Sequence, residues 1–171
     1  MCGGRRKKRD PEEPADHALG RLRGGFSTKI HAVCEGDGLP LSFELSPGQT
    51  HETQLFDELW ESTEVHDATG QYRVQPDALA GDKAYRSSAI IEQLELDGVE
   101  PVIPEKGDKA NAEAHPDFDR EAYRRRNVIE RLIGRLKEFR RIFGRFEKTA
   151  VNYLGMLHAA AVLLYLRELT G

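Results

Sequence analysis

Residues 118–146 read FDREAYRRRNVIERLIGRLKEFRRIFGRF, and the spacing of their apolar side chains predicts one long helix. Asp117 or Asp119 stands where a helix-capping carboxylate belongs, and no proline interrupts the segment that follows. With about 100° between successive residues, one side of this helix is apolar and can pack on a core. That side carries Val128, Ile129, Leu132, Ile133, Leu136, Phe139 and Phe143.

The opposite side of the predicted helix is polar. A single stripe is formed there by Tyr123, Arg126, Glu130, Gly134, Lys137 and Arg141. Most charged helix faces are solvated surfaces with ion pairs, and that is the ordinary interpretation of this one. Two features favour a binding surface instead. The first is Gly134 in the middle of the helix, where a glycine costs about 1 kcal/mol relative to alanine. Its missing side chain would let a large partner approach the backbone. Basic residues also outnumber acidic ones between Arg120 and Lys148, in a chain whose net charge is −4, which suggests a polyanionic partner.

The length and composition indicate one domain with a hydrophobic core. The chain has 171 residues, of which 39% are hydrophobic. No membrane span is expected, because the most apolar run, Ala159 to Leu166, is shorter than a bilayer requires. Cys2 and Cys34 are too few for a disulfide framework or a zinc site, which fits a reducing cytosol. No secretory signal is expected, since no apolar stretch follows the basic residues near the N-terminus.

The first half of the chain predicts a mobile segment followed by a β-hairpin. Residues 1–19 are basic and rich in proline and glycine, without a hydrophobic period, and are expected to be mobile. Residues 27–34 and 39–45 have the alternation of two strands with one buried side, joined by a turn at 35–38. A short helix capped by Thr50 is expected next.

Residues 78–104 predict a strand-helix-strand unit. Ala78 to Gly81 forms a short strand, Ser87 or Ser88 caps the helix, and Val99 to Ile103 forms the second strand. The first strand delivers Asp82 at its carboxyl end. After the long helix, Thr149 is expected to cap a last helix, and because its residues are apolar almost all round, this helix is predicted to be buried.

Asp82 and Glu130 are the candidate metal ligands. An acid at the carboxyl end of a parallel strand points toward the crevice where open α/β sheets bind ligands, although a loop aspartate that caps the next turn is an equal alternative. Carboxylates from separate elements can together hold Mg²⁺ ions for phosphoryl transfer. Arg126 and Lys137 would then hold the phosphates of the strand being cut.

Tyr123, Arg126, Glu130 and Lys137 complete the pattern Y-x-x-R-x-x-x-E-x-x-x-x-x-x-K. With LAGDKAYRS, PVIPEKG and two longer blocks that together span Leu19 to Leu166, the chain resembles the C-terminal part of DDE-type transposases of bacterial insertion sequences. The resemblance implies an α/β fold that is a partial ribonuclease H-like domain. Its parts would be the hairpin, the strand-helix-strand unit, a long catalytic helix and a buried C-terminal helix. Residues 20–171 would form this C-terminal part of the catalytic domain.

The resemblance also implies residue roles. Asp82 and Glu130 would be the second and third catalytic acids, and both would bind Mg²⁺ or Mn²⁺ in a two-metal site. Tyr123 would support the site and, with Arg126, Lys137 and Arg141, would form the surface for transposon-end DNA. His51 matches a family position near the active centre, where a surface or supporting role is favoured over catalysis. Family members act as multimers on paired DNA ends, so a homo-oligomer is expected when the protein is active. Action on DNA also implies a cytoplasmic protein that is associated with the nucleoid when it is bound to DNA.

The first catalytic aspartate of the family and its strand have no counterpart here. Asp10 and Asp16 precede Leu19, but both lie in proline- and charge-rich sequence without an apolar run. Some members are encoded in two frames joined by ribosomal frameshifting, and the RRKK run near the start suits such a junction. We therefore expect the downstream portion of a transposase, inactive without an upstream-frame polypeptide. Two alternatives remain open: an inactive DNA-binding or decoy partner of a full-length transposase, and a non-functional remnant.

Overall fold

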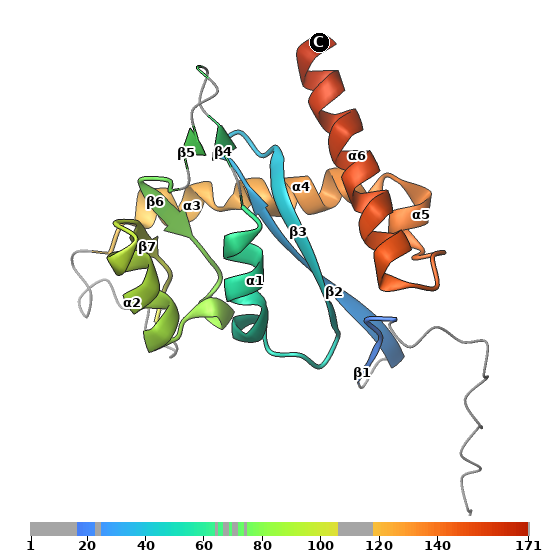
Figure 1. Cartoon of the computed structure of the whole chain (residues 1–171), viewed down its shortest axis with the longest axis horizontal. Helices are drawn as coiled ribbons and strands as arrows, with labels where there is room; N and C mark the ends of the chain where they lie inside the picture. The colour runs from blue at the N-terminus through green and yellow to red at the C-terminus, as the bar shows by residue number, and fades with distance from the viewer. Residues whose placement is uncertain are drawn as a thin grey trace, which may run out of the picture.

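The computed structural model describes residues 17–22, 25–63, 65–66, 69, 72–73, 75–105 and 118–170 as a mixed α/β arrangement (Figure 1). Nearly all of the predicted mobile segment, with Asp10 and Asp16, lies outside these residues, as does the alternative cap Asp117. Two strands of two residues each, β4 (Val65–His66) and β5 (Tyr72–Arg73), pair antiparallel with each other.

The predicted hairpin is confirmed. Strands β2 (Gly25–Cys34) and β3 (Pro40–Pro47) pair antiparallel, with Thr28 opposite Pro47. Gly38 lies in the turn with φ +91°, a backbone conformation that favours glycine. A short additional strand, β1 (Gly20–Leu22), pairs with the beginning of β2.

Both faces of the hairpin are covered, although the sequence predicted only one buried side. On one face Phe43 packs in a core cluster with residues of the C-terminal helices. On the other face His31, Ser42 and Ser46 are buried. Helix α1 (Phe56–Glu61) packs there, and Ser42 donates a hydrogen bond to the Leu59 carbonyl at 3.4 Å. The alternation of apolar residues identified the first face but could not show that a helix covers the second.

A short 3-10 helix, η1 (Glu52–Leu55), precedes α1. The expected cap Thr50 is wrong by one residue, because the His51 side chain accepts the hydrogen bond from the Thr53 amide. His51 is exposed, and its role in this structure is to cap the short helix η1.

The strand-helix-strand unit is confirmed. Strands β6 (Ala78–Ala80) and β7 (Glu100–Val102) pair parallel, and α2 (Ser88–Leu96) connects them after a 3-10 turn, η2 (Lys83–Tyr85). The Ser87 hydroxyl caps α2 by accepting from the Ile90 amide at 3.2 Å. A second core cluster lies beneath this unit and contains Phe56, Ile90, Leu94, Val99 and Ile103. In the described residues β6 and β7 form their own two-stranded sheet, separate from β2 and β3.

The single long helix was wrong: residues 118–146 form three helices, α3 (Arg120–Arg125), α4 (Asn127–Lys137) and α5 (Arg140–Phe143). Asp119 caps the first, and its Oδ1 accepts from the Ala122 amide at 2.8 Å. The first break follows from a tightened turn in which the Arg126 amide bonds to the Tyr123 carbonyl. At the second break Phe139 is extended, with φ −77° and ψ 109°.

The second break changes which side chains of the segment are buried. Leu132 and Leu136 of α4 are fully buried, as predicted from the apolar side. After Phe139 a new helix begins, and its side chains no longer follow the 100° spacing counted from α4. Ile142 is therefore buried, whereas Phe143, which was predicted to be a core residue, is 73% exposed.

Helix α6 (Ala150–Thr170) is buried along only one stripe. That stripe contains Tyr153, Leu157, Ala160 and Leu164, which pack in the core cluster, while Val151 and Leu169 are exposed. The prediction of a helix buried all round is therefore wrong, because β3 and α5 contact a single side of it. The Thr149 hydroxyl accepts from the Asn152 amide, as the expected cap should.

Among the described helices, α6 is long and apolar enough to cross a membrane. Core helices of soluble proteins also meet this criterion of length and composition, and Tyr153, Leu157 and Leu164 belong to the core.

Candidate active site

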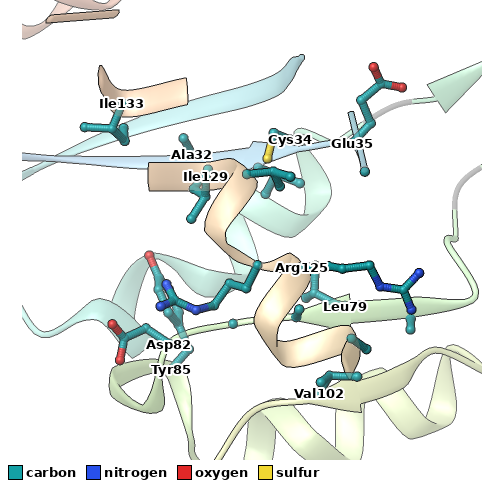
Figure 2. A pocket seen from close by; sticks show the side chains of 18 of the residues that line it. Ala32, Cys34, Glu35, Leu79, Asp82, Tyr85, Val102, Arg125, Ile129 and Ile133 are labelled. Atoms are coloured by element: carbon teal, nitrogen blue, oxygen red, sulfur yellow. The ribbon is translucent and has the colours of Figure 1, made fainter. Parts of the chain in front are cut away.

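A cleft of about 680 Å³ separates β2 from the β6–β7 sheet. Figure 2 shows Ala32 and Cys34 of β2 on one side of it, and Leu79 and Val102 on the other. Helices α3 and α4 close the cleft through Ala122, Arg125, Arg126, Val128, Ile129 and Ile133. The cleft is therefore mainly apolar, with charged groups at its margins.

Asp82 lies in the cleft wall, beyond the carboxyl end of β6 and separated from it by Gly81, as the sequence predicted. Its Oδ1 accepts a hydrogen bond from the Ala84 amide at 3.3 Å and caps η2. The two alternatives for this residue, a helix cap and a cleft-facing acid, thus hold together. Because the carboxylate is exposed, it can still bind a ligand.

A polar network that the sequence did not reveal joins the β2–β3 hairpin to η2, the 3-10 turn that Asp82 caps. His31 Nδ1 lies 2.7 Å from the Tyr85 hydroxyl, and His31 Nε2 lies 2.8 Å from the Ser46 hydroxyl. Burial lowers the pKa of His31. Burial, together with the nearby carboxylates of Glu52 and Asp82, raises the pKa of Tyr85 to about 12. A neutral imidazole and a neutral phenol thus fix the segment that follows Asp82.

Lys29 and Glu52 form an ion pair close to this network. Lys29 Nζ lies 2.6 Å from Glu52 Oε1 and also donates to the Thr50 carbonyl. Burial opposes ionisation of Glu52, but the hydrogen bond and charge of Lys29 outweigh it and lower the pKa of the carboxyl group. The pair fastens the loop after β3 to β2.

Arg126 connects the cleft to the polar stripe of α3 and α4. Its guanidinium lies over the Tyr123 ring, 5.2 Å from the centroid, and its Nη2 donates to Glu130 Oε1 at 3.0 Å. Arg126 lines the cleft together with Asp82, whereas Glu130 does not, and the Glu130 side chain is 62% exposed.

The other stripe residues extend away from the cleft. Gly134 and Lys137 are exposed farther along α4, and a Cβ atom added to Gly134 would meet open space. Arg141 lies in α5 and donates to Glu147 at 2.9 Å. The structure therefore brings Tyr123 and Glu130 together around Arg126, which lines the same cleft as Asp82, and it places Arg141 in a separate helix.

The chain's similarity to a known family shows to which class of protein this cleft and its side chains belong. A family model described as a transposase DDE domain matches residues 5–165. The chain belongs to the DDE transposase domain family. The family resemblance predicted from the sequence is thereby confirmed, and the DDE transposases act on DNA and depend on divalent metal ions.

A curated relative agrees with this assignment. The DDE transposase domain is 30% identical over 142 residues to a Brucella ovis protein named as a transposase for insertion sequence element IS6501. The aligned region covers 83% of this chain and 100% of that protein. No solved structure matches the chain.

The carboxylates of Asp82 and Glu130 are the side chains of the DDE transposase domain that were predicted to bind a divalent metal ion. Mg²⁺ prefers oxygen ligands and usually takes one or two protein carboxylates, with water and phosphate oxygens completing its shell. Asp82 and Glu130 offer such oxygens. Within the described ranges no group of three or more His, Cys, Asp and Glu side chains could hold a metal ion. The carboxylates of Asp82 and Glu130 are thus of the right chemical type for a divalent ion, but the described residues contain no complete metal site.

Proposed function

We propose that this DDE transposase domain takes part in metal-dependent phosphodiester cleavage and strand transfer at the ends of an insertion sequence. The main support is one arrangement of side chains: Asp82 and Arg126 line the same cleft, and Arg126 bonds to Glu130. The Arg126 guanidinium can bind a phosphate diester, and the carboxylates of Asp82 and Glu130 can bind the divalent ions that this chemistry requires.

Asp82 and Glu130 are the proposed ligands of Mg²⁺ or Mn²⁺. Arg126 donates only to Oε1 of Glu130, so Oε2 is available for a metal ion within the part of the chain that the structure describes. A bound divalent ion supplies Lewis acidity for an attacking oxygen and for the leaving oxygen. The hydrogen bond from the Ala84 amide orients the Asp82 carboxylate.

Tyr123, Arg126, Lys137 and Arg141 are the proposed DNA-binding residues. Cationic side chains along an exposed helix face can contact phosphates, which gives affinity that depends on salt. The Tyr123 ring holds the Arg126 guanidinium from one side and so limits its orientations. Arg141 is paired with Glu147 through Nη1, and its other guanidinium donors can contact a phosphate.

We further infer that the described elements are parts of a ribonuclease H-like domain. The antiparallel hairpin, the parallel strand pair that ends at Asp82 and the helix that bears Glu130 support this inference. No third catalytic acid is assigned among the described residues: Glu35 and Asp37 also line the cleft, but no group of three acids there could hold a metal ion. The chain alone is accordingly proposed to cut DNA little or not at all, and to need an upstream polypeptide.

The test compares Mn²⁺-dependent nicking of insertion-sequence end DNA by the chain and by a fusion that carries the upstream region. The fusion should nick, and Asp82→Asn and Glu130→Gln should each abolish its activity. Asp57→Asn and Glu92→Gln are matched controls, because each removes one exposed carboxylate outside the cleft, and they should nick like the parent fusion.

Two outcomes would change this proposal. Parental activity in Asp82→Asn or Glu130→Gln would remove that residue from the mechanism. Salt-dependent binding of DNA by an inactive fusion would instead favour the alternative function, a non-cleaving DNA-binding partner.

A further inference from the structure

Two exposed phenylalanines lie where α5 ends and the chain turns toward α6. Phe143 is 73% exposed and Phe146 is 58% exposed, although aromatic side chains usually supply much of the buried apolar area of a fold. Figure 1 shows α5 and this turn at the far end of α4 from α3, away from β6 and Asp82. The two rings are therefore outside the cleft, and the chemistry proposed there does not use them.

The backbone of the turn fixes Phe146 against the end of α5. Arg145 has φ +41°, a left-handed conformation that residues other than glycine rarely adopt. This conformation lets the Phe146 amide donate to the Arg141 carbonyl at 3.3 Å, which closes the end of the helix. The Phe146 ring packs directly on Gly144, because a Cβ atom added there would lie 3.0 Å from a ring carbon. The ring is thus held in a defined position while most of the residue stays in solvent.

The two rings lie in a strongly basic segment. Residues 135–148 contain six arginines and lysines but two glutamates, and one of these glutamates is already paired with an arginine of α5. The Arg140 guanidinium lies over the Phe146 ring, 5.9 Å from its centroid. Arg140 and Phe143 are three residues apart in α5, so their side chains are neighbours on its surface. Aromatic and cationic groups are therefore interleaved on one exposed surface.

This combination is typical of surfaces that bind unpaired nucleotides. Aromatic rings stack on the faces of the bases, while cationic side chains contact the phosphates between them. Inside a duplex each base is enclosed by its neighbours, so an exposed ring can stack only on a base that has left the duplex. A protein partner would have to cover the same rings without leaving the surrounding cations unpaired, and a polyanion meets this requirement directly.

We propose that Phe143 and Phe146 form a stacking platform for unpaired bases of a DNA strand, with Arg140 at the adjacent phosphates. The proposal rests on the proposed function, because it takes DNA as the ligand of this domain. It adds a second contact region at the α5 end of the chain, and it specifies that the DNA held there is single-stranded.

The test measures binding of the full chain to a labelled single strand of about 20 nucleotides and to the duplex of the same sequence, by fluorescence anisotropy at low salt. Phe143→Leu and Phe146→Leu keep an apolar side chain but remove the ring. Each should weaken single-strand binding by about fivefold or more and duplex binding by less than about twofold. Phe26→Leu is the matched control, because it removes a ring that is 75% exposed at the beginning of β2, and it should keep both affinities.

Phe143→Trp gives a second readout, because it retains an aromatic ring and adds a fluorophore. Its single-strand affinity should equal that of the parent chain. Saturating single-stranded DNA should quench the added emission, and Trp60, the one tryptophan of the parent chain, supplies the baseline in the same titration of the parent. A ring with a purely structural role would give no such quenching.

The possible results separate this inference from the proposed function. Parental single-strand affinity in both leucine variants would overturn the platform and leave the cleavage proposal in place. Equal losses for single strand and duplex would overturn the assignment to unpaired bases. A dimer that the leucine variants lose in sedimentation, with DNA affinities unchanged, would identify a second copy of the chain as the occupant. Failure of the parent chain to bind either form of DNA would contradict the proposed function, and the platform would fall with it.

Discussion

Arg126 Nη2 lies 3.0 Å from Glu130 Oε1, so the proposed catalytic acid is held by a cation one helical turn before it. An exposed pair of this spacing contributes only about 0.3–0.5 kcal/mol to stability. Glu130→Gln should therefore lower the free energy of unfolding by less than about 1 kcal/mol, while it abolishes nicking by the fusion. Urea denaturation and the nicking assay measure the two effects. A much larger loss of stability would show that Glu130 has a structural role.

The buried His31 makes stability depend on pH. Burial lowers its pKa in the folded state, so the unfolded state binds more protons in acid. The contribution of His31 is complete above the unfolded pKa, about 6.5, and it is lost as pH falls from there through the folded pKa. Urea unfolding between pH 8 and pH 5 should show this loss, and His31→Gln should reduce the pH dependence.

His51→Gln is a second variant for that measurement, because it removes the exposed imidazole that caps η1 and leaves His31 in place. The pH dependence that comes from His31 should persist in it. An unchanged pH dependence in His31→Gln would mean that another group is responsible.

Local patterns predicted much of this fold. The caps Asp119 and Thr149, the hairpin and the parallel pair that presents Asp82 each depend on residues close together in sequence. The breaks at Arg126 and Phe139 were missed, because an apolar period without proline continues across both. The first break is a tightened turn at Arg126, and the second is the extended backbone of Phe139.

The candidate site was predicted in part for a similar reason. The polar stripe identified Arg126 and Glu130 as neighbours, since they are four residues apart on one helix. His31 and Tyr85 are separated by 54 residues, and the sequence predicted only one buried side for the hairpin. The burial of His31 involves Tyr85, which comes from η2, and no local pattern contains this information.

Ser87, not Ser88, caps α2. Its hydroxyl accepts from the Ile90 amide, and removal of such a cap costs about 1 kcal/mol. Ser87→Ala should lower the free energy of unfolding by that amount. Ser88→Ala changes the exposed next residue and should shift stability by less than about 0.5 kcal/mol. Equal losses in thermal or urea unfolding would contradict the capping assignment.

Gly134 tests whether a ligand approaches the backbone of α4. An added Cβ meets open space there and also at Gly155 of α6, so both alanine variants should be more stable by about 0.5–1 kcal/mol. If DNA contacts the polar stripe, Gly134→Ala should weaken end-DNA binding, whereas Gly155→Ala should not. Equal affinities in fluorescence anisotropy would show that DNA does not contact Gly134.

Lys137 tests the electrostatic part of DNA binding. If its ammonium group contacts one phosphate, Lys137→Ala should reduce the slope of log affinity against log salt concentration by about 0.9. Lys148→Ala is the matched control, because it removes an exposed lysine from the loop before α6. Anisotropy titrations at several salt concentrations give both slopes. The contact is absent if the two variants keep the parent slope, and binding is diffuse over the basic surface if both lose the same amount.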